Sequence, residues 1–526
     1  MIDFLSSVLT AILVVILILL LQENFKGRDK QLAPGPFRFP VVGNLLQITW
    51  INSKEPYLAF TKLSRRYGDI MSIQLGSVYA VVFNSFEMIE ESLTKPEFSD
   101  RFFNGWLSER TFQKQLGIVF SKYPFPWQQL RRFSLRTLRD FGFGKKSRMH
   151  SIIHAELDDV VGDIKKRIKK DNGIITFDGY FTISTLNLVW SMMVGTRYEH
   201  SDPKLIRLTK VAKDFFASSN TANNILLAYP EWRNWFPNWT GMTVQRNCYH
   251  ETNHFFQGII DERKRLGVYK TMPENLIDEF LYEIESQSTQ DGADNETVFT
   301  EEQLIGLMSD FFLAGTETSS NTLAWCMLYL LTNPQVQKKL QNEIDAVIPL
   351  GSFLTSEHEP LLHYTKATLA ETHRMASVFP LMVPRAALED TYCGEFFVPK
   401  GTYIMANIYN VHHDKCYWKD PEIFRPERFI DDNGQFIGDP RLKPFGFGRR
   451  VCLGEPLASM SLLHYLTVLM QNFTFNAVSN EPIPSVNPVV GITNAPQACE
   501  DLDEHNTYKN KFIITPVAHF ETIRKA

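Results

Sequence analysis

The sequence has little cysteine and no large excess of charge of either sign. Its six cysteines are scattered over 526 residues at spacings that form no disulfide framework, so we expect reduced thiols facing the cytosol. The formal net charge of −5 gives no reason to expect nucleic-acid binding. No internal repeat, no glycine-rich dinucleotide fingerprint and no linker between large segments is visible. These absences disfavour a repeat architecture, a nucleotide-binding domain within the chain and several separate domains.

Clusters of metal-ligating residues are equally scarce. His412, His413 and Cys416 lie close together in the chain, with Cys393 upstream. Their spacing matches none of the common zinc fingers. An incidental grouping is therefore the favoured interpretation, and a zinc site is the alternative.

Long hydrophobic runs are absent except at the start of the chain. The run from Phe4 to Leu21 is broken only by two serines and one threonine, and it is about long enough to cross a hydrocarbon layer of ~30 Å. Three basic residues follow between positions 26 and 30, so the positive-inside rule keeps the remaining chain in the cytosol. A cleaved signal peptide is the alternative, but a basic start and a small-residue cleavage site are not evident.

These features divide the chain into three parts. Residues 1–25 are predicted to form a membrane signal anchor, residues 26–44 a basic and Pro/Gly-rich linker, and residues 45–526 one large domain. Prolines stiffen the linker into a short spacer between membrane and domain. Hydrophobic residues make up 44% of the sequence and phenylalanine occurs 40 times, which is ample for one large core.

The hydrophobic periodicity predicts a mainly α fold with small β-sheets. Helices are predicted over residues 58–67, 127–138, 154–169, 181–194, 205–218, 301–331 and 457–471. Apolar runs at 70–75 and 79–83, on either side of a Gly-Ser pair, predict a hairpin.

Two segments favour surface positions. Residues 226–242 contain Trp232, Trp235 and Trp239 beside prolines, a composition typical of a segment at a membrane interface. A buried aromatic cluster in a loop explains the same composition equally well. The polar, acidic stretch at 285–297 is interpreted as a surface loop.

The sequence around Cys452 is the most informative part of the chain. Residues 445–454 read Phe-Gly-Phe-Gly-Arg-Arg-Val-Cys-Leu-Gly, the pattern F-x-x-G-x-R-x-C-x-G. A cysteine thiolate donates electron density to haem iron and favours cleavage of the O–O bond. The glycines let the main chain pass close to sulfur and porphyrin, and Arg450 could neutralise a haem propionate. A buried, inert cysteine in a glycine-rich turn is the alternative.

Four further segments stand in a fixed order before this motif: Trp127-Gln128-Gln129-Leu130-Arg131, Ala314-Gly315-Thr316-Glu317-Thr318-Ser319, Glu371-Thr372-His373-Arg374 and Phe424-Arg425-Pro426-Glu427-Arg428-Phe429. Together with the cysteine motif they resemble the cytochrome P-450 family of haem-thiolate monooxygenases over nearly the whole chain. The stretch 130–139 looks like the microsomal clan that holds animal drug-metabolising and insect hormone-related members. The ordered set gives the resemblance its weight, because E-x-x-R alone recurs by chance in many helices.

The resemblance implies a single haem-thiolate domain that binds haem b behind an N-terminal transmembrane helix. Cys452 would be the metal ligand. The positions that match the family's cofactor-binding residues are Cys452, Arg450, Trp127, Arg131, Arg385 and Arg101. The arginines among them would neutralise the haem propionates.

Glu317 and Thr318 match the family's catalytic acid–alcohol pair. Oxygen activation needs protons delivered in a mostly apolar site, and an acid beside a hydroxyl can supply them. A threonine bonded back to its own helix is the alternative interpretation. Gly315 costs the helix about 1 kcal/mol relative to alanine, and this cost would be explained by a ligand that approaches the backbone.

Two other sets are implied by the same resemblance. Glu371 and Arg374 lie at i, i+3 and can pair on one helix face, and Arg428 could join them, in a structural role needed for folding around the cofactor. By position, the substrate pocket would include Ala314, Val383 and Ile492, whose apolar side chains imply a lipophilic substrate.

The implied activity is an NADPH- and O₂-dependent monooxygenase whose electrons come from a separate reductase. The basic face of residues 131–139 would dock NADPH–cytochrome P-450 reductase, with cytochrome b5 as a second candidate donor, although a merely solvated basic face is the alternative. The location would be the endoplasmic reticulum membrane, with the domain in the cytosol. An endogenous terpenoid or steroid hormone and a xenobiotic remain alternative substrates. The alternative functions are a haem-thiolate isomerase or dehydratase and a non-catalytic haem sensor. An acidic stretch at 499–504 reads as an insertion into the last hairpin.

Overall fold

The computed structural model describes residues 31–143, 146–170, 174–176, 179–219, 225–288, 297–478, 485–497 and 511–517. The predicted anchor at 1–25, the first residues of the linker and the acidic stretch at 499–504 lie outside the described residues. Among the helices that the model describes, none combines the length and apolar character needed to span a bilayer.

The described part is mainly helical. Its helices are α2 (Leu45–Ile51), α3 (Pro56–Tyr67), α4 (Phe86–Thr94), α5 (Gly105–Ser108), α6 (Trp127–Asp140), α7 (Lys146–Lys170), α8 (Thr182–Met193), α9 (Pro203–Ser218), α10 (Ile225–Ala228), α11 (Trp232–Trp235), α12 (Met242–Leu266), α13 (Leu276–Ser288), α14 (Glu301–Thr332), α15 (Pro334–Val347), α16 (His363–Ala376), α17 (Ile408–His412), α18 (Lys415–Trp418) and α19 (Glu455–Asn472). Every helix expected from periodicity is present.

Four small sheets complete the fold. The strands are β1 (Ile70–Leu75), β2 (Val78–Phe83), β3 (Ile174–Thr176), β4 (Arg385–Ala386), β5 (Thr391–Cys393), β6 (Phe396–Val398), β7 (Tyr403–Ala406), β8 (Phe473–Ala477), β9 (Pro488–Val490), β10 (Asn494–Pro496) and β11 (Lys511–Pro516). The largest sheet has the order β1-β2-β7-β4, and the others are β3-β11-β8, β5-β6 and β9-β10. The predicted hairpin is confirmed as β1 and β2, which pair antiparallel with Leu75 opposite Val78.

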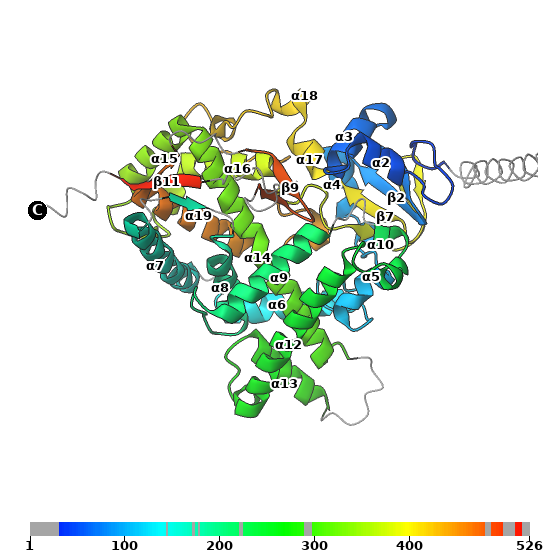
Figure 1. The fold of residues 1–526 in the computed structure, drawn as a ribbon, viewed down its shortest axis with the longest axis horizontal. Coiled ribbons are helices and arrows are strands. Elements are labelled where there is room, and N and C mark those ends of the chain that lie inside the picture. The colour runs from blue at the N-terminus through cyan, green and yellow to red at the C-terminus, as the bar shows by residue number, and fades with distance from the viewer. Residues whose placement is uncertain are drawn as a thin grey trace, which may run out of the picture.

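Helix α14 runs through the middle of the molecule (Figure 1). The Thr300 side chain caps it by accepting from the N–H of Gln303, and two glutamates in the first turn favour its N-terminus. Its residues are buried on nearly all sides, as expected for a core helix. It packs against α8, α12, α16, α19 and β10. The sheet formed by β1, β2, β7 and β4 lies toward one end of the molecule, beside α2 and α3 (Figure 1).

Two surface predictions are refined by the structure. Helix α13 extends to Ser288. The prediction of a surface loop over residues 285–297 was therefore wrong for its first four residues, which are helical. The segment 226–242 divides into two parts. Leu226 and Leu227 are buried, whereas the side chains of Trp235 and Trp239 are 70% and 69% exposed. The burial expected of an aromatic cluster does not extend to these two tryptophans, and the membrane interface stays a prediction.

Candidate functional site

The loop before α19 places Cys452. Gly448 opens the 3₁₀ turn η6 (Gly448–Arg450) with a φ of 60°, and a Cβ at this position would lie 2.3 Å from the carbonyl oxygen of Leu93. Only glycine fits this approach. The N–H of Cys452 donates to the carbonyl of Phe445 at 2.9 Å, which closes the loop. Helix α19 then begins three residues after the cysteine.

The sulfur of Cys452 faces the N-terminus of α19. The side chain is accessible although many protein atoms surround it, so the sulfur is not enclosed by packed protein on every side. Burial raises the pKa of the Cys452 thiol, whereas the backbone N–H groups of Gly454 and Glu455 and the charge of Arg131 lower it. The same N–H groups can donate hydrogen bonds to a thiolate, and a coordinated metal ion deprotonates a thiol outright.

Three of the predicted cofactor-binding arginines are buried beside this loop. The guanidinium of Arg450 donates to the carbonyls of Ser99 and Ser121 at 2.9 and 2.6 Å. It also lies 4.5 Å above the Trp127 ring, and Arg131 lies 5.6 Å from the same ring. Arg450, Trp127 and Arg131 therefore share one region with Cys452.

Arg385 and Arg101 complete the group. Arg385 donates to the carbonyls of Leu93 and Phe447, and Arg101 donates to those of Val383 and Pro384. Burial lowers the pKa of both side chains, and the positive charge of Arg101 lowers that of Arg385 further.

This arrangement fits haem b. Among the described residues, no carboxylate forms an ion pair with Arg101, Arg131, Arg385 or Arg450. The pKa of Arg450 is lowered first by burial and then by its arginine neighbours. Asp310 and Asp100 partly offset the charge of Arg101, and Asp100 that of Arg450, but buried like charges without a carboxylate in direct contact still favour a further anion nearby. The two propionates of haem would provide one, and the adjacent thiol would provide the iron ligand.

Glu317 and Thr318 are neighbours on α14, but their side chains differ in burial and in hydrogen-bond partners. The carboxylate of Glu317 is 8% exposed and accepts a hydrogen bond of 3.1 Å from the Thr493 hydroxyl. The Thr318 hydroxyl is half-buried and donates to the carbonyl of Ala314 at 2.7 Å. The back-bonded geometry considered for Thr318 is thus present, and its lone pairs can still accept a proton-donating partner.

Gly315 faces a neighbouring helix. A Cβ at this position would lie 2.7 Å from Cγ2 of Val189 on α8. The glycine therefore permits α14 and α8 to pack closely, which explains its place in the helix without a ligand. That a ligand approaches the backbone here stays a prediction.

The three predicted pocket residues come from three elements. Ala314 is exposed although its neighbours on α14 are mostly buried, so the helix borders open space at this turn. Val383 precedes β4 and is partly exposed. Ile492 lies at the tip of the β9–β10 hairpin, where its N–H donates to the carbonyl of Phe216 at 3.3 Å.

Glu371, Arg374 and Arg428 form one buried network. Arg374 donates to both carboxylate oxygens of Glu371 at 2.7 and 2.9 Å, and Arg428 donates to Glu371 at 3.3 Å. Arg374 also donates to the carbonyls of His412 and Pro421, each at 2.8 Å. The network joins α16 to the 3₁₀ turn η5 (Pro426–Phe429), to the end of α17 and to the loop after α18.

The residues considered for a zinc site do not share one. Cys393 pairs with Ser92 at 2.8 Å, His412 bonds to Ser377 at 3.0 Å, and Cys416 is exposed. No group of metal-ligating side chains in the described part of the chain includes any of them.

Two contacts of this region had no signal in the sequence. Thr493 lies 176 residues from its partner Glu317. Arg110 forms a buried ion pair with Asp310 of α14, and Asp310 also accepts from the N–H groups of Ile118 and Val119. Both contacts join segments far apart in the chain, and only the folded structure brings them together.

One surface pocket lies apart from these residues. It has a volume of about 940 Å³ and is lined by residues that include Phe39, Val41, Phe102 and Tyr229. None of the predicted cofactor-binding residues lines it, so it is not the cofactor site.

The fold and the site define a haem-thiolate protein: a mainly helical domain with a cysteine at a helix N-terminus, beside arginines suited to two propionates. Comparison with known proteins agrees. The model of the family Cytochrome P450 matches residues 33–499. The chain belongs to this family.

Similar proteins come from insects, crustaceans and mammals. The chain is 32% identical to farnesoate epoxidase from Bombyx mori, covering 91% of this chain and 94% of that protein. It is 33% identical to cytochrome P450 2L1 from Panulirus argus, covering 86% and 90%. It is 34% identical to cytochrome P450 2J3 from Rattus norvegicus, covering 87% and 88%. The protein is an oxidoreductase of the monooxygenase type with haem b as cofactor, a redox partner and a small-molecule substrate.

Proposed function

We propose that this protein is a microsomal monooxygenase that inserts one oxygen atom of O₂ into a lipophilic substrate, with electrons from NADPH–cytochrome P-450 reductase. The balanced reaction is RH + O₂ + NADPH + H⁺ → ROH + H₂O + NADP⁺, and an alkene substrate would give an epoxide. Residues 1–25 would anchor the chain in the endoplasmic reticulum membrane, and residues 26–44 would connect this anchor to the cytosolic domain at 45–526.

The observation that most supports this proposal is that one domain contains two sets of residues suited to this chemistry. Cys452 lies beside Arg131 and the other arginines, and α14 carries Glu317 and Thr318 as neighbours. Haem, when bound at Cys452, would supply oxygen activation and transfer. A protein that only carried or sensed haem would have no use for a buried acid beside a hydroxyl.

The chain's own residues would divide the work as follows. Cys452 would hold the iron, and Trp127, Arg131, Arg450, Arg385 and Arg101 would orient the propionates. Thr493 would fix the carboxylate of Glu317. The Thr318 hydroxyl would receive protons that Glu317 relays and deliver them to oxygen.

The substrate would enter an apolar region. Ala314, Val383 and Ile492 offer only methyl and methylene groups, which favours lipophilic molecules. The name of one relative, farnesoate epoxidase, makes a terpenoid acid a candidate substrate, beside steroid hormones and xenobiotics.

The reductase would dock on α6. Arg132, Arg136 and Arg139 are exposed on this helix, whereas Trp127 and Leu130 are buried. The helix thus presents its positive charge outward, close to the residues around Cys452, and an acidic partner would be attracted there. Cytochrome b5 would compete for the same face.

The exposed aromatic residues support a membrane position for the domain. Trp235, Phe236 and Trp239 are more than half exposed, and aromatic side chains of this kind favour the bilayer interface.

One experiment separates the proposal from its alternatives. The purified protein is combined with the reductase, NADPH, O₂ and a panel of terpenoid, steroid and xenobiotic substrates, and product is compared with NADPH consumed. A monooxygenase forms oxygenated product that requires NADPH and contains oxygen from ¹⁸O₂. Peroxide rearrangement without NADPH would instead establish the isomerase or dehydratase, and the absence of any turnover across the panel would favour a sensor.

A further inference from the structure

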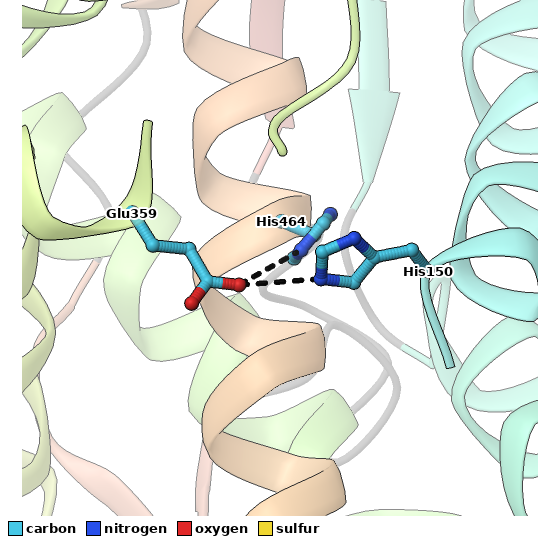
Figure 2. A group of neighbouring side chains, drawn as sticks. All are labelled: His150, Glu359 and His464. Carbon is cyan, nitrogen blue, oxygen red and sulfur yellow. Dashed lines mark hydrogen bonds and ion pairs between the residues drawn. The ribbon is translucent and has the colours of Figure 1, made fainter. Parts of the chain in front are cut away.

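Three side chains outside the predicted haem site meet between helices. His150 comes from α7, His464 from the middle of α19, and Glu359 from the 3₁₀ turn η4 (Glu359–Leu361) that precedes α16. Figure 2 shows the two imidazoles and the carboxylate pointing toward one another. In the described part of the chain, this is the one group of three or more histidine, cysteine or acidic side chains placed closely enough to hold a metal ion.

The spacing of the ligand atoms suits a small divalent ion. In a tetrahedral zinc site with bonds of about 2.1 Å, neighbouring ligand atoms lie about 3.4 Å apart. The Nε2 atom of His150 lies 3.2 Å from Oε1 of Glu359, and Nε2 of His464 lies 3.9 Å from the same oxygen. All three ligand atoms lie within 4.8 Å of one another. Small side-chain rotations would therefore bring them onto the corners of one tetrahedron.

The surroundings of the cluster are shielded from solvent. The side chains of His464, His150 and Glu359 are 0%, 12% and 15% exposed. A fourth donor lies close by, because the His154 ring is centred 5.8 Å from that of His150 and 5.3 Å from that of His464. His154 stacks on Phe353 at 4.1 Å, and its buried Nε2 has no hydrogen-bond partner.

An ion pair without a metal ion is the competing explanation for this cluster. The contact between His200 and Glu156 is such an ion pair and provides a comparison. His200 lies 2.9 Å from the buried carboxylate of Glu156, but Arg197 binds the same carboxylate at 2.6 Å. A permanent cation therefore neutralises Glu156. At Glu359 the Nε2 atoms of two imidazoles approach one carboxylate oxygen, and a neutral imidazole can bind a metal ion through the lone pair of a ring nitrogen.

We propose that His150, Glu359 and His464 form a binding site for a divalent transition-metal ion of the zinc class, with His154 or a water molecule as the fourth ligand. Imidazole and carboxylate are ligands that zinc accepts readily. The ion would join α7, η4 and α19. Because α19 begins beside Cys452, the site would stabilise the segment that holds the thiolate.

Metal content per haem tests the proposal on the intact protein. The chain is purified with haem and without an added histidine tag, treated with a chelator, and dialysed against buffered low-micromolar zinc. We expect about one zinc per haem in the wild type. His150→Gln and Glu359→Gln should each remove this zinc.

Two variants serve as matched controls. His200→Gln removes a histidine that also contacts a buried glutamate, and Cys416→Ala removes an exposed thiol that could bind zinc by itself. Both should retain the zinc. If the wild type binds no zinc, or if His150→Gln binds as much as the wild type, the assignment is wrong.

Two further measurements guard against misfolded variants. The reduced, CO-bound spectrum of each variant reports an intact haem-thiolate site. In the wild type alone, zinc should protect His150 from acylation by diethyl pyrocarbonate, as read by peptide mass spectrometry, and should raise the temperature at which the thiolate spectrum is lost. Equal labelling of His150 with and without zinc would contradict the proposal even if every variant failed to fold.

Discussion

The hydroxyl of Thr493 donates a hydrogen bond of 3.1 Å to Oε2 of Glu317. Thr493 lies in the turn between β9 and β10, and Glu317 lies in the middle of α14. The two side chains are 3% and 8% exposed, so little water competes for the bond. A loop that borders the predicted substrate pocket thus holds the predicted acid of the catalytic pair.

Thr493→Val should uncouple oxygen use from product formation. The substitution keeps the shape of the side chain and removes a hydrogen bond to a charged group, which is worth about 1.5–3 kcal/mol. Product formed per NADPH should fall roughly tenfold or more, with hydrogen peroxide released instead. Thr493→Ser restores the hydroxyl and should restore coupling. Unchanged coupling in the valine variant would mean that Thr493 does not position Glu317.

Cys452→Ala should abolish the red-shifted Soret band of the reduced, CO-bound protein. That band requires a thiolate opposite the CO, and the loop from 445 to 454 places no other cysteine beside the arginines. Cys416→Ala changes an exposed thiol far along the chain and should leave the band intact. A normal spectrum in Cys452→Ala would show that Cys452 is not the ligand of the haem iron.

Local patterns predicted more of the fold than of the site. The helices follow from their apolar periodicity, and the β1–β2 hairpin follows from two apolar runs around a Gly-Ser turn. Glu371 and Arg374 are three residues apart on one helix, so their pairing was visible from spacing alone.

Contacts between distant segments were not predictable in this way. Thr493 and Glu317, or His150 and His464, become neighbours only when helices and loops from different parts of the chain pack together. The packing role of Gly315 was hidden for the same reason, because the side chain that requires a glycine there is Val189 on another helix.

Reversing two charges on α6 should slow electron delivery. Arg132→Glu with Arg136→Glu changes exposed residues on the face where we expect the reductase, and steering by such charges commonly changes association rates by about tenfold or more. The rate of haem reduction should fall most at low salt, because ions screen the attraction. Turnover supported by added peroxide should persist.

The control for this experiment reverses two lysines on another helix. Lys204→Glu with Lys210→Glu alters α9 by the same total charge at exposed positions. If both pairs of reversals slow reduction equally, net charge explains the effect and a docking face on α6 does not.

Breaking the buried network around Glu371 should cost more stability than breaking a surface pair beside it. Glu371→Gln leaves Arg374 and Arg428 buried without a countercharge, which costs about 3–5 kcal/mol. Glu427→Gln removes an exposed pair with Lys339 and should cost about 0–1 kcal/mol. Thermal unfolding and haem retention measure both. Equal losses would show that the network has no special role in folding around haem.

Acid should destabilise the protein through His412. This side chain is fully buried, Nδ1 bonds to the Ser377 hydroxyl at 3.0 Å, and Nε2 accepts the N–H of Lys443 at 3.4 Å. Burial lowers its pKa well below the ordinary value, and the neighbouring His413, Arg374 and His373 lower it further.

The sign of the effect follows from which state binds the proton. The unfolded chain binds a proton at His412 near pH 6.5, whereas in the folded chain the lowered pKa keeps this imidazole neutral at that pH. Stability is therefore full above this pH and falls as the pH drops below it, by about 1.4 kcal/mol per pH unit for each such histidine. Burial also lowers the pKa of His373 to about 4 and that of His413 to about 3. These two side chains therefore also make the folded protein less stable as the pH falls.

His412→Gln should therefore reduce the slope of the unfolding free energy against pH between 6.5 and 5.5 by the contribution of one histidine. The slope should not fall to zero, because the other buried histidines still contribute. Denaturant unfolding at several pH values measures the slope. The variant is expected to be less stable than the wild type at pH 7.5, because it loses the fixed imidazole, and to lose less on acidification. His254→Gln, which replaces an exposed histidine on α12, should keep the wild-type slope. A His412→Gln slope equal to that of the wild type would show that the folded protein protonates His412 as readily as the unfolded chain does.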